Sequence, residues 1–390
     1  MNRIYFDNNA STILDPEVRM AVEEASALYG NPSSVHAEGR RARRAVEEAR
    51  EEVARLIDAR PEEIVFTSGG TEANAMAIFG AVAEQSAGRI VTTGAEHPSV
   101  REPISALGRR GLPFAVEIVA PEPDGRLDVE RIRDAIVPGT VLVSVMAANN
   151  EYGGVYPVAP IARAARERGA LFHTDAVQAA GRVPISVEEA GADLISLSAH
   201  KMHGPKGAGA LYVRRGTRLA AHTPGGGQEK RLRAGTENTP ALVGFGVAAR
   251  VARMRRESDA PLMERLRDRL EASVLSRTPE ARVVGGGAPR LPNTSAILFS
   301  GVSGEALAIR LDLDGVAVSV GSACSSGTVT ASPAFLALGL SQTDAKCVVR
   351  FSLSRYSTSE EVDRAADLVP RLVAEARAVG SRPLASARSG

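Results

Sequence analysis

Short runs rich in β-branched and apolar residues alternate with helical segments along the first two thirds of this 390-residue chain. The segment 37–59 is typical of the helices, because Val46, Ala49 and Val53 fall on one apolar stripe among arginines and glutamates. Strands separated by helices usually pair in parallel, beneath those helices. The alternation therefore predicts an α/β fold with a mainly parallel, seven-stranded sheet, its strands at 63–67, 90–93, 116–119, 141–145, 171–174, 194–197 and 210–213.

After about residue 255 the strands become sparser, which indicates a second, smaller α+β domain. A long helix is expected to bridge the two domains. The other expected elements are a charged helix at 261–274, strands at 296–300, 316–319 and 348–353, and a last amphipathic helix at 359–379 with a possible kink at Pro370.

The overall charge and the cysteine content exclude several classes of protein. A formal net charge of +1 gives no field that would draw the chain to nucleic acid or acidic lipid. No apolar run approaches the roughly 18 residues of a membrane span, and the N-terminus has no secretory apolar segment. Two cysteines suit a reducing compartment rather than a disulfide scaffold. We therefore expect a cytoplasmic protein that binds neither nucleic acid nor membrane directly.

Lys201 ends the sequence Ser-Ala-His-Lys, directly after the predicted strand 194–197. An ammonium group at the end of a buried strand is costly, but an amine there makes sense if it forms a Schiff base with a carbonyl compound. Taken alone, the position is interpreted more simply as an ordinary surface lysine. The nearby Lys206 represents that simpler case.

Asp175 follows the strand 171–174, so Asp175 and Lys201 are expected at one edge of the sheet, where α/β folds bind ligands. Pyridoxal phosphate (PLP) needs a carboxylate opposite its pyridine nitrogen and a lysine for its aldehyde. Asp175 and Lys201 would supply these two groups. The alternative for Asp175 is an N-cap of the helix that follows it.

Two further segments follow strands. Gly69 and Gly70 precede Thr71 at the start of a helix, where free N–H groups can bind a phosphate. A glycine turn with a threonine cap is the alternative. His97 follows the strand 90–93, where an imidazole could stack on a cofactor ring and move protons, although loop histidines are more often merely solvated.

Cys324 is surrounded by small residues, in the sequence Val-Gly-Ser-Ala-Cys-Ser-Ser-Gly at 320–327. Such a segment packs little and is expected to form a mobile loop, whereas an inert free cysteine is normally buried as a small apolar residue. Cys347 precedes the apolar strand 348–353 and fits that buried case. We therefore expect Cys324 to be the reactive thiol.

Together these segments resemble the cysteine desulfurases of the class V aminotransferases, within the aspartate-aminotransferase-like (fold type I) PLP superfamily. The segment around Cys324 is similar to that of the long-loop, type I subgroup, which includes desulfurases of iron–sulfur cluster assembly. The resemblance implies a large PLP-binding domain at 13–258 and a small domain, made of 1–12 and 259–390, that carries Cys324. It covers nearly the whole chain, through the segments 5–12, 30–36, 67–74, 148–151, 198–201, 225–229, 233–238 and 350–355.

For the positions that match, the resemblance implies a role for each residue. Lys201 binds PLP covalently, Asp175 pairs with the pyridine nitrogen, and His97 stacks on the ring and assists proton transfer. Cys324 takes sulfur as a persulfide, L-alanine is the product, and an acceptor protein receives the sulfur. The remaining expected contacts are Gly70, Thr71, Ser198, His200 and, across a homodimer, Thr236 at the phosphate, Gln178 at the ring hydroxyl, and Asn150 and Arg355 at the carboxylate of L-cysteine. No metal site is expected.

The chain departs from the family pattern at three places. Ala199 stands where the family usually has glycine, residues 331–334 differ from the usual Glu-Pro-Ser-His, and 381–390 lacks the aromatic tail of housekeeping members. The sulfur acceptor and its pathway, iron–sulfur cluster assembly or another thio-modification, therefore stay open.

Two other functions remain as alternatives. Another PLP enzyme, such as a class V transaminase or a selenocysteine lyase, would share Lys201 and Asp175 without needing a persulfide. A noncatalytic sulfur-relay or scaffold subunit would keep only the fold and its interfaces, and the intact set of Lys201, Asp175 and His97 argues against it.

Overall fold

The computed structural model describes residues 3–325 and 328–380, and of residues 322–325, 328–329 and 379–380 only the backbone. The strands of its central sheet are β2 (Ile64–Thr67), β3 (Gly88–Thr93), β4 (Phe114–Val119), β5 (Thr140–Ser144), β6 (Leu171–Asp175), β7 (Leu194–Ser198) and β8 (Gly209–Val213). They follow the spatial order β2-β8-β7-β6-β5-β3-β4, and the pairs are parallel except where β8 meets β2 and β7. The predicted α/β class and mainly parallel seven-stranded sheet are confirmed.

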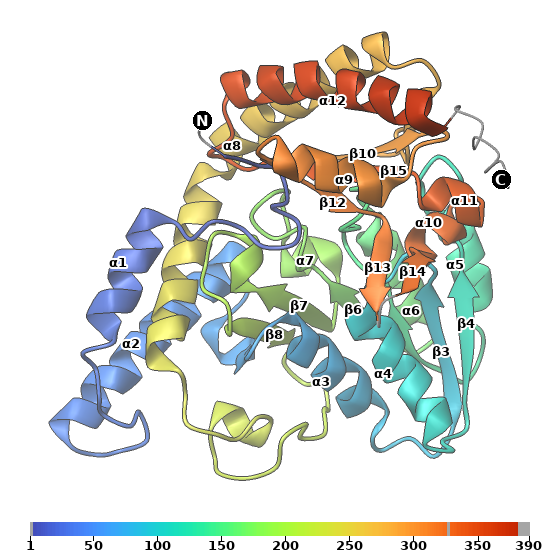
Figure 1. Cartoon of the computed structure of the whole chain (residues 1–390). Coiled ribbons are helices and arrows are strands. Elements are labelled where there is room, and N and C mark those ends of the chain that lie inside the picture. The colour runs from blue at the N-terminus through green and yellow to red at the C-terminus, as the bar shows by residue number, and fades with distance from the viewer. Residues whose placement is uncertain (1–2, 326–327, 381–390) are drawn as a thin grey trace, which may run out of the picture.

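Helices cover this sheet (Figure 1). They are α1 (Pro16–Ala25), α2 (Ala37–Leu56), α3 (Gly70–Val82), α4 (Pro98–Arg109), α5 (Val129–Ala135), α6 (Val158–Glu167) and α7 (Val187–Ala190), with the 3₁₀ turns η1 (Pro61–Glu63), η2 (Ala199–Lys201) and η3 (Glu229–Arg231). The predicted apolar stripe of α2 is its buried face, where Val46, Ala49 and Val53 lie. Because α3 and α4 each begin just after a strand, they present their N-termini at the carboxyl edge of the sheet.

One helix of 39 residues, α8 (Thr239–Arg277), runs from α1 and α2 to α12 (Ser359–Gly380) (Figure 1). It is the expected bridging helix, but the prediction of a separate helix beginning at Pro261 was wrong, because Pro261 lies inside α8. An interior proline removes a backbone hydrogen bond and costs about 3 kcal/mol. Packing of α8 against other helices at both of its ends offsets that cost.

The second part of the molecule contains a four-stranded antiparallel sheet in the order β12-β15-β10-β9, with strands Ser319–Val320, Val348–Ser352, Thr294–Phe299 and Ala281–Val283. The N-terminal strand β1 (Ile4–Tyr5) pairs with β11 (Val316–Ala317), so Ile4 and Phe6 join an apolar core formed by residues 266–373. The other elements here are α9 (Gly304–Leu313), α10 (Pro333–Ala337), α11 (Gln342–Ala345) and a hairpin of β13 (Ser322–Ser325) with β14 (Thr328–Ala331).

The domain boundary after residue 258 stays a prediction, because α8 passes through it without interruption. Among residues 3–325 and 328–380, no helix has the length and apolar character needed to cross a bilayer.

Candidate active site

A pocket opens at the carboxyl edge of the central sheet, where α/β folds place their ligands. Its lining comes from the segments that follow β2, β3, β5, β6 and β7, and it includes every predicted site residue except Thr236, Cys324 and Arg355. The lining residues are Gly70, Thr71, Asn74, His97, Ser99, Met146, Asn150, Asp175, Val177, Gln178, Ser198, His200 and Lys201.

Lys201 reaches this pocket from η2, which continues directly from β7. Its Nζ donates to the backbone carbonyls of Asn9 and Ala10, both at 2.7 Å. Burial, followed by the nearby Arg182 and Arg350, lowers the pKa of the Lys201 amine to about 7. The amine is therefore partly neutral near physiological pH, as a nucleophile must be, whereas Lys206 is exposed outside this pocket.

Asp175 is held by two donors at the end of β6. Its Oδ2 accepts a hydrogen bond from Asn74 Nδ2 at 2.7 Å, and its Oδ1 accepts from the backbone N–H of Val177 at 2.9 Å. The second contact closes a turn, and no helix follows in residues 176–186, so the helix N-cap alternative was wrong. The carboxylate is only 5% exposed and lines the pocket that Lys201 enters.

One side of the pocket is suited to an anion. The N-terminus of α3 starts there at Gly70 and Thr71, and the buried Ser198 Oγ has no hydrogen-bond partner among the described residues. The pocket wall is close at Gly70, because a Cβ at this position would lie 2.7 Å from Val177 Cγ2 and would force that side chain to move. Burial lowers the pKa of His200 to about 4, so its imidazole is neutral.

Ala199 does not have a positive φ, so its backbone conformation does not need the glycine that the family usually has at this position.

The pocket brings together a free buried hydroxyl, a helix N-terminus, a partly neutral amine and a fixed carboxylate. These are the groups that PLP requires, so the residues present fit this cofactor.

His97 caps α4, and its Nδ1 accepts a hydrogen bond from the backbone N–H of Ser99 at 3.1 Å. The same nitrogen lies 2.7 Å from Ser99 Oγ. Burial lowers the pKa of His97, while Asp175 opposes that effect and Lys201 adds to it. His97 is an exposed residue, but its ring is fixed by Ser99 at the start of α4 and lines the pocket, so it differs from a freely solvated loop histidine.

Asn74 and Ser99 are site residues for which the sequence predicted no role. Asn74 is fully buried in α3 among Ala73, Met76 and Ala77. An isolated polar residue on an otherwise apolar helix is the signal that could have identified it, because a buried amide must find partners. Ser99 carries no comparable signal, since a serine at a helix start is common.

Gln178 and Asn150 line the pocket but are partly engaged by the protein itself. Gln178 Nε2 donates to the backbone carbonyl of Asn9 at 3.0 Å, and its Oε1 accepts from Arg182. The backbone carbonyl of Asn150 accepts from Arg350 Nη1 at 2.9 Å, which fixes the main chain at this point and leaves the Asn150 side chain at the pocket surface.

Arg355 lies in an adjoining cavity, which shares Lys201 with the first. Its Nε is 3.4 Å from Asp259 Oδ2, and its buried Nη1 has no hydrogen-bond partner among the described residues. The guanidinium thus lines the cavity that shares Lys201 with the main pocket, and its Nη1 is available for a further anion.

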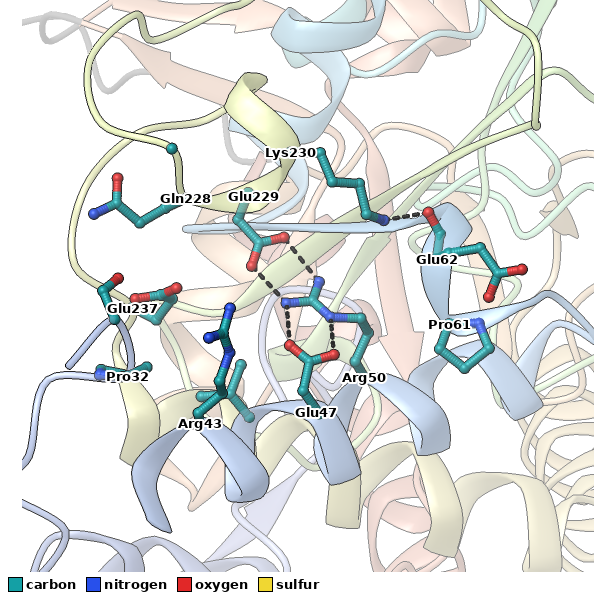
Figure 2. A pocket seen from close by; sticks show the side chains of 13 residues that line it. Pro32, Arg43, Glu47, Arg50, Pro61, Glu62, Gln228, Glu229, Lys230 and Glu237 are labelled. Carbon is teal, nitrogen blue, oxygen red and sulfur yellow. Dashed lines mark hydrogen bonds and ion pairs between the residues drawn. The ribbon is translucent and has the colours of Figure 1, made fainter. Parts of the chain in front are cut away.

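Thr236 is exposed and contributes to neither cavity. Its segment is attached to the large sheet through Glu229, whose carboxylate accepts from Arg50 Nη1 and Nη2 at 2.8 and 2.7 Å (Figure 2). The same carboxylate accepts from the Phe66 N–H at 2.7 Å. Lys230 Nζ donates to the carbonyl of Glu62 (Figure 2). These contacts border a larger cavity, of about 600 Å³, in which acidic and basic side chains alternate without a common charge.

The backbone of Cys324 lies in β13 and pairs with Val329 of β14. The structure therefore has a hairpin where the sequence predicted a mobile loop without strands, and the mobility stays a prediction. The thiol itself, which the sequence predicted to be reactive, lies outside the described residues. Cys347 is buried beside β15, and burial raises the pKa of its thiol, as expected of a packing residue.

Comparisons with known proteins agree with this geometry. Residues 4–365 match the family model described as aminotransferase class-V. A cysteine desulfurase of Cereibacter sphaeroides is 46% identical over 383 residues, which cover 97% of this chain and 98% of the relative. A solved NifS-like protein superposes with a TM-score of 0.88 at 35% identity, covering 96% of this chain and all of the other.

A second solved structure, SspA in complex with cysteine, superposes with a TM-score of 0.79 at 33% identity and covers 91% of this chain and all of the other. The similarity spans nearly the full length of each relative, and the pocket residues supply what PLP requires. The chain therefore belongs to the aminotransferase class-V family and is one of its PLP-dependent cysteine desulfurases.

Proposed function

We propose that this desulfurase transfers the sulfur of L-cysteine to its own Cys324. In the net reaction, L-cysteine and the Cys324 thiol give L-alanine and a Cys324 persulfide: the substrate Cβ–S bond breaks and an S–S bond forms. The observation that carries this proposal is the convergence of Lys201, Asp175 and His97, from three separate elements, on one pocket.

Within this pocket we assign the expected roles to the residues that line it. Lys201 would hold PLP covalently, Asp175 would meet its ring nitrogen, and the free Ser198 hydroxyl would meet its phosphate, together with Thr71 and His200. When bound, PLP supplies an electron sink for the electrons left on the substrate Cα. Gln178 would meet the ring hydroxyl, and Asn150 would meet the substrate carboxylate.

Lys201 is the group best suited to accept the Cα proton. Its pKa of about 7 leaves a large neutral fraction at physiological pH, and a base with a pKa near the working pH is the most effective. Arg355 lines the cavity that shares Lys201 with the main pocket, and we assign its unpaired Nη1 to the substrate carboxylate. Cys324 is assigned as the sulfur acceptor on sequence grounds.

Three wider assignments complete the proposal. We infer a homodimer in which Thr236 contacts the phosphate of the other subunit, because Thr236 is exposed and does not line the pocket of its own chain. We further infer a cytoplasmic location and a sulfur-acceptor protein, in iron–sulfur cluster assembly or another thio-modification pathway.

The test is to reduce the protein with borohydride and map the labelled peptide. Reduction converts a Schiff base into a stable amine, so the cofactor should stay attached to the peptide that contains Lys201. Lys201→Ala should abolish both the label and the visible absorbance, whereas Lys206→Ala should leave both unchanged. A label on Lys206 would contradict the assignment.

A further inference from the structure

A continuous chain of hydrogen bonds joins His97 to Asp175 across the pocket. Asn74 Nδ2 donates to Asp175 Oδ2 at 2.7 Å and also to Ser99 Oγ at 2.8 Å. Ser99 Oγ in turn lies 2.7 Å from His97 Nδ1. Asn74 and Ser99, the two middle members, are 0% and 7% exposed, so water does not compete for the two contacts that Asn74 donates.

The chemistry of each group fixes the direction of this chain. A carboxylate oxygen only accepts, so the neighbour of Asp175 must be the amide nitrogen of Asn74. That nitrogen also donates to Ser99 Oγ, which leaves the hydroxyl proton of Ser99 free to point at His97. The backbone N–H of Ser99 also points at His97 Nδ1, at 3.1 Å. Two donors therefore converge on one nitrogen, and the ring proton must lie on the other.

We propose that Asn74 and Ser99 are positioning residues that hold His97 as the neutral tautomer with its proton on Nε2. The inference rests on the proposed function in that His97 is taken as the residue beside the cofactor ring. It assigns different roles to His97 and Lys201. His97 presents a hydrogen-bond donor to the pocket, and Lys201 is the residue that accepts and returns protons.

The charges around His97 agree with these roles. Protonation of Nδ1 would break both contacts from Ser99, and burial already lowers the pKa of His97. Lys201 from η2 and Arg101 from α4 also lower that pKa, and Asp175 from β6 is the group that raises it. The environments of His97 and Lys201 thus both favour the neutral forms of these two groups.

Nitrogen-15 NMR of the full-length protein, labelled selectively in its six histidines, measures the tautomer directly. Spectra are recorded between about pH 6 and pH 8, with PLP bound and after its removal, and His97→Gln identifies the signal. We expect the proton on Nε2 throughout this range in both forms. Ser99→Ala should move the signal toward a mixture of tautomers and raise the pKa of His97, whereas Ser99→Thr, which keeps the hydroxyl, should behave like the wild type.

His173, in β6 of the central sheet, provides a matched control. His173 is buried between two serines, with Nδ1 2.8 Å from Ser144 Oγ and Nε2 3.0 Å from Ser196 Oγ. Ser144→Ala removes one of those contacts and should alter the signal of His173 without changing that of His97. A change at His97 in Ser144→Ala, equal to that in Ser99→Ala, would reduce the chain to general packing and overturn the proposal.

Turnover gives a second, independent measurement. Ser99→Ala should lower kcat by about 10-fold, because loss of one oriented hydrogen-bond donor costs on the order of 10²-fold or more and the variant keeps part of the Nε2 tautomer, while KM for L-cysteine changes little. A proton on Nδ1 in the wild type, or a Ser99→Ala spectrum that matches the wild type, would overturn the proposal and leave the desulfurase activity untouched. Conversely, absence of alanine formation with the Nε2 tautomer intact would contradict the proposed function and not this inference.

Discussion

Two side chains in or beside the cofactor pocket have pKa values far from those of lysine and glutamate in water. The pKa of the lysine is lowered and that of the glutamate is raised. Lys201 has a pKa of about 7, and Glu96, one residue before His97, has a pKa of about 8. Burial is the first cause in both cases, since it disfavours the charged form of either group. Glu96 Oε1 accepts from Thr93 Oγ1 at 2.7 Å and from the Met146 N–H at 2.9 Å, so its proton belongs on Oε2.

Glu96 makes stability depend on pH in a definite direction. Its pKa is 4.5 in an unfolded chain and about 8 when folded, so the folded state binds the proton more tightly. The stabilisation is complete below about pH 4.5 and declines as the pH rises toward 8. Glu96→Gln removes this titration, so the loss of unfolding free energy between about pH 5 and pH 8 should shrink by about 3 kcal/mol.

Urea denaturation of both proteins at several pH values measures this difference. Glu48→Gln, at an exposed position of α2, is the control and should follow the wild type. Parallel pH profiles for the wild type and Glu96→Gln would show that Glu96 is ionised in the folded protein.

At the scale of elements, the segment that carries Thr236 depends on one buried ion pair. The Glu229 and Arg50 side chains are 2% and 8% exposed, and three consecutive residues, 229–231, adopt positive φ values to bring Glu229 to its partner. None of the three is glycine, so their backbone conformation is unfavourable on its own. The bidentate contact and the Phe66 N–H hold it in place.

Glu229→Gln should destabilise the protein by about 3 kcal/mol, because it removes the buried carboxylate partner of Arg50 and leaves only the exposed Glu47 as an anion beside that guanidinium. Glu122→Gln breaks the exposed pair with Arg131 and should cost less than about 1 kcal/mol. Chemical denaturation of the two variants gives the comparison. Similar small losses in both would mean that the segment around Thr236 is held by other contacts.

The elements that the sequence predicted well are those with a strong local pattern. Each strand of the central sheet is a short apolar run between helices, and each was placed within about two residues of its observed bounds, as is usual for such boundaries. The start of α8 and the hairpin at Cys324 were missed, because both depend on distant packing. Pro261 resembles a helix start locally, and only the neighbours of α8 reveal otherwise.

The same distinction applies to the site. Lys201, Asp175, His97 and Ser198 could be predicted because they follow strands that end at one edge. Ser99 could not, since its role depends on Asn74, 25 residues away in the chain. The placement of Arg355 against Asp259 likewise needed the fold, because α8 brings that aspartate to it.

On the scale of the whole molecule, the surface around Thr236 suits a second copy of the chain. Tyr29 and Val35 are 85% and 87% exposed, and Pro32 and Ser33, between them, border the cavity that Gly227 and Gln228 also line. Large exposed apolar side chains beside the segment that carries Thr236, the proposed ligand of the other subunit's phosphate, are typical of a subunit interface.

Mixing two inactive variants tests this arrangement. In a mixed dimer of Lys201→Ala and Thr236→Ala, one site carries both changes and the other carries neither, so random exchange should restore about a quarter of wild-type activity. Lys201→Ala mixed with Asp175→Ala is the control, because both residues line the pocket of one chain and no intact site can form. No recovery in the first mixture, despite demonstrated exchange, would contradict a shared site.

The central claim is that Cys324 receives the sulfur, and mass spectrometry of its peptide tests it most directly. Wild-type protein given L-cysteine without reductant should gain one sulfur atom on the Cys324 peptide, because a thiolate is a strong nucleophile toward sulfur. Cys324→Ser should still bind PLP but nearly stop forming alanine, whereas Cys347→Ser, at a buried packing position, should change little. A persulfide on Cys347, or full desulfuration by Cys324→Ser, would contradict the account.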